Sequence, residues 1–276
     1  MISRRESLIA VPLFAVALMA GCGKQQAVSA ETSHRLFVIL MDVSASVTRE
    51  ARDHYKDYVR QYVVPSLRPG DRVIAVRVGD APGTMRRILD KTLPPAGYDA
   101  PGPLVGTSVK EAIQECQDSF RQFKAARGAL ADELLGGFGE KAAAQHTYLI
   151  QTLDLVAVQY LAAFSGPKFL MFFSDMFESE GGHGAIDFER RSPNRATLDA
   201  TLKRGVASLV GTRVLVVGAT GGQSGSEDVF RANRAFWLGL FKALGGDASE
   251  QRYGYDPVYP ETAEQDDAST CGGSNS

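Results

Sequence analysis

Two uninterrupted apolar runs, each followed by a carboxylate, constrain the fold of this chain more than any other feature. Residues 36–41 (LFVILM) precede Asp42, and residues 169–173 (FLMFF) precede Ser174 and Asp175. Runs of this kind are typical of strands that are buried on both faces, as in a parallel sheet. Because ligands bind at the carboxyl ends of the strands in open α/β sheets, the two aspartates mark a candidate site.

The rest of the chain alternates between strand and helix patterns. The patterns predict further strands at 71–78, 85–93 and 212–217, and helices at 48–64, 107–135, 148–164, 196–209 and 229–244. This alternation predicts one α/β domain over 35–246, with a doubly wound, mostly parallel sheet flanked by helices. Residues 247–276 are predicted to form an acidic, partly disordered tail.

The first residues resemble an export signal. Arg4 and Arg5 precede an apolar run at 8–20, which is too short to cross a bilayer comfortably. The sequence Met19-Ala-Gly-Cys22 resembles the lipobox of bacterial lipoproteins, which implies that residues 1–21 are removed and that the Cys22 thiol is acylated. The paired arginines also resemble a twin-arginine signal, so the Sec and the twin-arginine export routes both stay open.

The lipoprotein resemblance also implies a location. Gly23, rather than an aspartate, follows Cys22. In lipoproteins this favours the outer membrane, so we expect a chain that is lipid-anchored in the bacterial envelope and faces the periplasm. Residues 22–34 are small and polar and are predicted to form a flexible tether. No other apolar stretch is long enough to form a membrane helix.

Composition limits the possible partners. The chain has 276 residues and a formal net charge of −2, so a broad basic surface for nucleic acid is not expected. Its three cysteines are too few for a disulfide scaffold, and their spacing matches no zinc pattern. Whether Cys116 and Cys271 pair in an oxidising compartment is left open.

A cluster of oxygen ligands follows the first apolar run. Asp42, Ser44 and Ser46 place one carboxylate and two hydroxyls at alternate positions of a single loop. Ligand sets made of oxygen alone suit a hard cation such as Mg²⁺, with Mn²⁺ or Ca²⁺ as alternatives. A simpler interpretation is that the serines cap the following helix while Asp42 accepts backbone N–H groups.

The Asp42-x-Ser44-x-Ser46 element resembles the metal-ion-dependent adhesion site (MIDAS) of von Willebrand factor A (VWA) domains. Asp175, after its own apolar run, fits the aspartate that this family has at the end of the next buried strand. The resemblance covers roughly residues 34–244. It implies that these four residues and a loop threonine bind a divalent cation, whose coordination an acidic side chain of a protein partner completes.

The threonine of the family pattern has three candidates. Thr147 is followed by the expected apolar residues and lies 28 residues before Asp175, which leaves room for a full helix, so we expect it to be the ligand. Thr152 fits in part but leaves only a short helix, and Thr107 lies 68 residues before Asp175. With Thr147 as the ligand, residues 107–146 exceed the connection usual in the family and are expected to form a helical insertion.

The resemblance therefore implies a lipid-anchored, non-enzymatic module that binds a partner protein through a divalent cation. One alternative is a small-molecule-binding α/β lipoprotein, although such receptors usually need two lobes and a longer chain. Another is a metal-dependent hydrolase, for example a phosphoryl hydrolase with Asp42 as its nucleophile. The haloacid-dehalogenase pattern, however, needs a second aspartate where this chain has Ser44.

Overall fold

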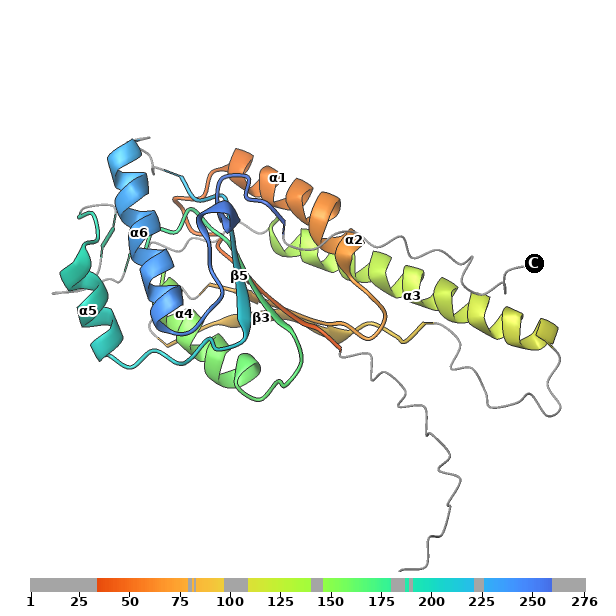
Figure 1. Cartoon of the computed structure of the whole chain (residues 1–276). Helices are drawn as coiled ribbons and strands as arrows, with labels where there is room; N and C mark the ends of the chain where they lie inside the picture. The colour runs from red at the N-terminus through yellow and green to blue at the C-terminus, as the bar shows by residue number, and fades with distance from the viewer. Residues whose placement is uncertain are drawn as a thin grey trace, which may run out of the picture. The chain divides into compact units, whose positions relative to one another are not determined.

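The computed structural model describes residues 34–78, 81, 83–96, 109–139, 146–179, 187–188, 191–220 and 226–259. Their centre is a six-stranded sheet in the order β3-β2-β1-β4-β5-β6 (Figure 1). The strands are β1 (Leu36–Met41), β2 (Arg72–Arg77), β3 (Arg86–Thr92), β4 (Lys168–Phe173), β5 (Thr212–Val217) and β6 (Tyr253–Gly254). All neighbours pair in parallel except β2 and β3, which are antiparallel. The predicted α/β fold class is confirmed.

The two apolar runs form the middle of the sheet. β1 pairs with β4 in register from Leu36 opposite Lys168 to Met41 opposite Phe173, and every residue of β1 is buried. The chain continues from β1 to β2 on one side and returns to β4 on the other. The strand order therefore reverses between β1 and β4, and the carboxyl ends of these strands are where such folds bind ligands.

Helices cover both faces of the sheet (Figure 1). They are α1 (Arg49–Tyr58), α2 (Val64–Ser66), α3 (Val109–Gly137), α4 (Leu149–Val156), α5 (Arg195–Lys203) and α6 (Glu227–Ala243), with π-helical turns at Val59–Val63 and Ala157–Leu161 and a 3₁₀ turn at Glu250–Arg252. Alternate residues of β1 point to opposite faces. Phe37 and Ile39 pack with α1 and α3, whereas Val38 and Leu40 pack with α4, α5 and α6.

Two segments differ from the sequence prediction. The helix predicted over 196–209 ends at Lys203, because Gly205 adopts the left-handed backbone conformation (φ +83°) that terminates helices. Residues 247–259, predicted as the beginning of the tail, instead add β6 to the sheet and continue onto α1. There the Tyr58 hydroxyl donates a hydrogen bond to the carbonyl of Pro257 at 2.9 Å.

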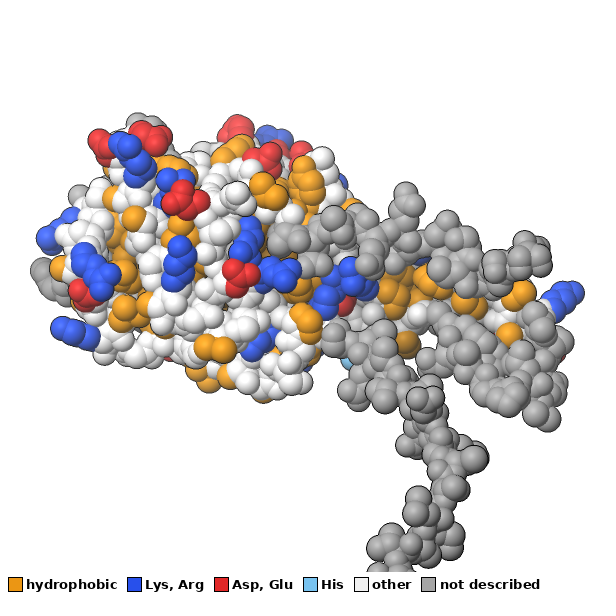
Figure 2. All heavy atoms as spheres, in the orientation of Figure 1, with side chains coloured by type: hydrophobic (Ala, Val, Ile, Leu, Met, Phe, Trp, Pro, Cys, Tyr) orange, Lys and Arg blue, Asp and Glu red, His pale blue; other side chains and the backbone are white. Residues whose placement is uncertain are grey.

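The face of the molecule shown in Figure 2 carries charged side chains of both signs among hydrophobic and other side chains. On the face shown in Figure 2, acidic and basic side chains are interspersed over α5 and α6. Several charged side chains pair, such as Arg231 with Asp228 on α6 at 2.6 Å and, after this helix, Arg252 with Asp247 at 2.6 Å. Within the described ranges, no helix combines the length and the apolar composition needed to span a membrane.

Candidate metal centre

Asp42 is fixed where β1 ends. Its N–H donates to the carbonyl of Phe173 at 2.9 Å and so continues the pairing of β1 with β4 by one residue. The side chain is 1% exposed. One carboxylate oxygen accepts the N–H of Ser44 at 2.9 Å, and the other accepts the hydroxyl of Ser174 at 2.7 Å. The first carboxylate is thus linked to the residue that directly precedes Asp175.

The two serines face each other and do not cap α1. The hydroxyl oxygens of Ser44 and Ser46 are 3.0 Å apart, with Ser44 buried and Ser46 half-buried. The N-cap of α1 is Thr48, whose hydroxyl accepts the N–H of Ala51 at 3.1 Å. The helix-capping interpretation of the serines is therefore wrong, although Asp42 does accept a backbone N–H.

Asp175 lies in a loop whose next residue, Met176, has a left-handed backbone conformation and is hydrogen-bonded by α6. Its carboxylate accepts the N–H of Phe177 at 3.1 Å, and the side chain is largely buried. Met176 has a φ of 65°, in the left-handed region that costs a non-glycine residue about 1–3 kcal/mol. Its carbonyl accepts two buried hydrogen bonds from α6, one from Asn233 at 3.0 Å and one from the indole of Trp237 at 2.9 Å. These two bonds offset the strain and fix Asp175.

Thr147 is joined to the same loop. Thr147 and Ser179 form an isolated antiparallel bridge, with N–H to carbonyl distances of 3.2 Å and 2.9 Å. The buried carboxylate of Glu178 accepts the N–H of Ile150 at 3.0 Å and so caps the N-terminus of α4. The loop that begins at Asp175 therefore also positions Thr147, which lies two residues before the start of α4.

The other two threonine candidates have different environments. Thr152 lies inside α4, where its fully buried hydroxyl donates to the carbonyl of Tyr148 at 2.7 Å. Thr107 lies outside the described residues, as do Cys22 and Cys271. Cys116, on α3, is disulfide-bonded.

Burial makes the Asp42 carboxylate costly as an anion. It raises the pKa of the Asp42 carboxyl above its usual range, while hydrogen bonds from Ser44 and Ser174 act in the opposite direction. Burial also raises the pKa of the Tyr55 hydroxyl well above its usual value, and the charges of Asp175 and Asp42 raise it further. The charges of both aspartates therefore reach the Tyr55 hydroxyl.

The available groups suit a hard cation. The described residues contain no cluster of three or more His, Cys, Asp and Glu side chains that could hold a metal ion. The oxygen set at the ends of β1 and β4 consists instead of two carboxylates and hydroxyls, which is the donor chemistry that Mg²⁺ prefers. The structure also leaves a fully buried hydroxyl, that of Tyr55, without a hydrogen-bond partner among the described residues.

Several contributors were missed by sequence reasoning. Ser174 could have been found, because it directly precedes Asp175 at the end of a buried strand. Asn233 and Trp237 carry no local signal, since they act on Met176 from 57 and 61 residues away. Tyr55 lies at helical spacing with Tyr58 and Val59 within 48–64, a pattern that accounts for a packed ring but not for a role of its hydroxyl.

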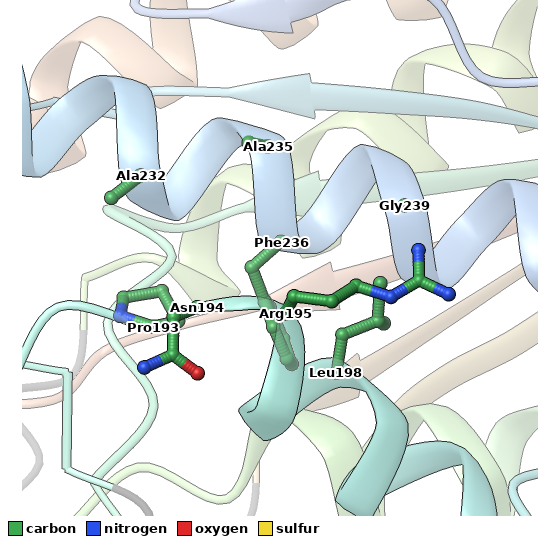
Figure 3. A pocket seen from close by; sticks show the side chains of 8 residues that line it. All are labelled: Pro193, Asn194, Arg195, Leu198, Ala232, Ala235, Phe236 and Gly239. Carbon is green, nitrogen blue, oxygen red and sulfur yellow. The ribbon is translucent and has the colours of Figure 1, made fainter.

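A separate pocket lies between α5 and α6 (Figure 3). It measures about 280 Å³ and is lined by Pro193, Asn194, Arg195, Leu198, Ala232, Ala235, Phe236 and Gly239. Its two polar side chains already have partners on α5, because Asn194 accepts the N–H of Thr197 at 3.1 Å and Arg195 pairs with Asp199 at 3.0 Å. None of the predicted metal-site residues lines this pocket.

No protein-family model and no curated protein matches the sequence. Among solved structures, the chain is similar to the pilus adhesin SpaC of Lactobacillus rhamnosus GG, with 11% identity and a TM-score of 0.41 over 75% of this chain and 27% of that chain. It is also similar to an aerotolerance-related membrane protein from Bacteroides fragilis, with 15% identity and a TM-score of 0.39 over 76% of this chain and 88% of that chain.

A von Willebrand factor type A protein from Catenulispora acidiphila is similar as well. The identity is 12% and the TM-score 0.33, over 77% of this chain and 42% of that chain. The chain thus spans less than half the length of SpaC and of this protein. Identities this low describe a likeness of fold alone.

Proposed function

We propose that the chain is a VWA-type module that binds a divalent hard cation, Mg²⁺ first among them, through a MIDAS-like centre. The centre consists of Asp42, Ser44, Ser46, Thr147 and Asp175. Through the cation it binds an acidic side chain of a protein partner. We assign no catalytic residue.

The arrangement at the carboxyl ends of β1 and β4 carries this proposal. Ser174 connects the two aspartates, and the hydroxyls of Ser44 and Ser46 face each other while Thr48 caps α1. Hydroxyls kept out of the helix cap, beside a buried carboxylate, form a set of oxygen atoms that suits a cation. The backbone bridge between Thr147 and Ser179 supports including Thr147, because it ties this residue to the loop that begins at Asp175.

The charge of the metal-loaded centre is compatible with an acidic partner. A divalent cation would neutralise the charge of the buried carboxylates. It would also offer a coordination position for one more oxygen. Two carboxylates balance that charge formally and leave no net negative charge to repel an incoming Asp or Glu. The partner's carboxylate is then the group that completes the coordination.

We further propose that Cys22 carries the lipid anchor and that the module faces the periplasm from the outer membrane. This part rests on the lipobox-like sequence Met19-Ala-Gly-Cys22. The module therefore has two attachments, one to the membrane through its lipid and one to a protein through its cation.

A fluorescence titration tests the metal centre. The chain has one tryptophan, Trp237, and its indole N–H bonds the carbonyl of Met176, the neighbour of Asp175. Emission should therefore change as Mg²⁺, Mn²⁺ or Ca²⁺ is added to EDTA-treated protein. Asp42→Asn keeps the shape of the side chain but removes its charge, and it should abolish the change. Asp199→Asn, the same exchange on the surface of α5, should not.

The partner interaction needs a second experiment. Chemical cross-linking in envelope extracts should yield adducts that disappear with EDTA and with Asp42→Asn. If the wild type shows no fluorescence response to any of the three ions, the metal-dependent function is wrong. If it responds but its adducts persist in EDTA, the cation does not mediate the interaction.

The pocket between α5 and α6 supports a second candidate function, the binding of a small apolar molecule. Its apolar walls would accept such a ligand whether or not a cation is present. Binding of the fluorescent probe ANS, lost in an Ala235→Phe variant and insensitive to EDTA, would favour this alternative.

A further inference from the structure

The Tyr55 hydroxyl lies at the carboxyl edge of the sheet. Tyr55 extends from α1 and is fully buried. Its ring packs edge-on against Phe173, the last residue of β4, with centroids 5.7 Å apart. The hydroxyl end contacts Gly218, the residue after β5, so closely that a Cβ atom there would lie 2.5 Å from the phenolic oxygen. The hydroxyl therefore lies at the carboxyl end of β5, the strand that neighbours β4.

This hydroxyl has no hydrogen-bond partner among the described residues. Buried hydroxyls normally find one, because leaving a desolvated donor unsatisfied costs free energy. Tyr58, one turn further along α1, follows the rule and donates to the carbonyl of Pro257. The difference between two neighbouring tyrosines on one helix indicates that the partner of Tyr55 is not part of the chain described.

The surrounding charges indicate what that partner is. Burial is the main cause that raises the pKa of the Tyr55 hydroxyl, and the charges of Asp175 and Asp42 raise it further, so the hydroxyl stays protonated. A protonated phenol is a donor, and the space between two carboxylates attracts a cation with its water. Tyr253 is another buried tyrosine whose hydroxyl lacks a partner within the described ranges; burial raises its pKa well above the usual value, and the charge of Asp175 raises it further.

We propose that Tyr55 is a positioning residue of the metal centre, whose hydroxyl donates a hydrogen bond to a water of the hydrated cation when that cation is bound by Asp42 and Asp175. This inference rests on the proposed function. Mg²⁺ keeps several of its waters in proteins, and a buried water needs two or more polar partners. The Tyr55 hydroxyl and a carboxylate provide them, and the ring, held by Phe173 and Gly218, fixes the direction of the donor.

Two matched variants test the proposal. Tyr55→Phe removes a hydroxyl that has no partner in the apo protein, so the melting temperature in EDTA should stay the same or rise. The Kd for Mg²⁺, measured by Trp237 fluorescence, should increase about tenfold or more, as it does when groups that orient metal ligands are removed. Tyr58→Phe removes a bonded hydroxyl, so it should lower the melting temperature in EDTA and leave the Kd unchanged.

The outcomes separate this inference from the proposed function. If the wild type does not respond to metal, both fail. If it responds and Tyr55→Phe has the wild-type Kd, the role of Tyr55 is refuted while the metal centre stands. A fall in the EDTA melting temperature of Tyr55→Phe also refutes it, because the hydroxyl then has a partner without metal. An equal rise in Kd for both variants shows a general effect of α1 and refutes it too.

Discussion

Gly218→Ala should destabilise the domain through two separate effects at one position. Gly218 has a φ of +90°, a conformation that alanine adopts only with strain. A Cβ atom there would lie 2.2 Å from Cε1 and 2.5 Å from the hydroxyl oxygen of Tyr55. The ring cannot move away easily, because it is fully buried between Phe173 and Phe138.

The two effects have different magnitudes. The left-handed backbone conformation costs alanine about 1–2 kcal/mol. Overpacking of a filled core costs about 1–3 kcal/mol. The free energy of unfolding should therefore fall by about 2–5 kcal/mol. At about 2–4 °C per kcal/mol for a chain of this size, the melting temperature should fall by about 4–20 °C.

Urea denaturation with a control glycine separates the two effects. Gly205 also has a positive φ, +83°, but a Cβ atom there would meet nothing within 4 Å. Gly205→Ala should therefore lose only the backbone part, about 1–2 kcal/mol. In a double-mutant cycle, Gly218→Ala combined with Tyr55→Ala should be less destabilised than the sum of the single variants by about 1–3 kcal/mol. Equal denaturation midpoints for Gly218→Ala and Gly205→Ala would show that Tyr55 does not approach Gly218 closely.

Three further predictions concern the anchor, the loop ligand and acid stability. Cys22→Ser should move the protein from the membrane to the soluble fraction, because buried acyl chains supply the attachment; a variant that still sediments with membranes contradicts lipidation. Thr147→Ala should raise the Kd for Mg²⁺ more than Thr152→Ala, whose effect should be on stability; calorimetry giving the reverse order would reject Thr147 as the ligand. Hydrogen bonds from Arg72 hold the pKa of the Asp90 carboxyl below its usual range, so the pair stabilises the fold above about pH 4 and loses this contribution as the pH falls through the lowered pKa. Asp90→Asn should cost up to about 1 kcal/mol at pH 7 and less at pH 2, and a loss of equal size at both pH values would contradict this assignment.

The sequence was most informative where one physical requirement dominates. Burial on both faces leaves only apolar residues in 36–41 and 169–173, so the centre of the sheet could be predicted from these runs alone. The position of Asp42 and Asp175 at its carboxyl edge followed directly. The end of α5 was predicted six residues too late, at 209 instead of Lys203. The apolar spacing continues past Gly205, and the prediction gave this spacing more weight than the tendency of glycine to end a helix.

Contacts between distant segments could not be predicted in this way. β6 has only two residues, too few for a periodic pattern, and its place beside β5 depends on pairing 37 residues away along the chain. The conformation of Met176 depends on Asn233 and Trp237, whose own helical pattern indicates only core packing. Spacing along α1 likewise placed the rings of Tyr55 and Tyr58 on one face, but it could not tell that only one of the hydroxyls would have a partner.

The course of β1 sets how far the module can extend from the bilayer. The chain enters β1 at Leu36, and Asp42 follows the opposite end of the strand, about 20 Å away at the usual rise per residue. If Cys22 holds the lipid, residues 22–34 can add at most about 45 Å when fully extended. Asp42 then follows the end of β1 that is farther along the chain from the anchor, and a partner can be captured only within about 65 Å of the membrane surface.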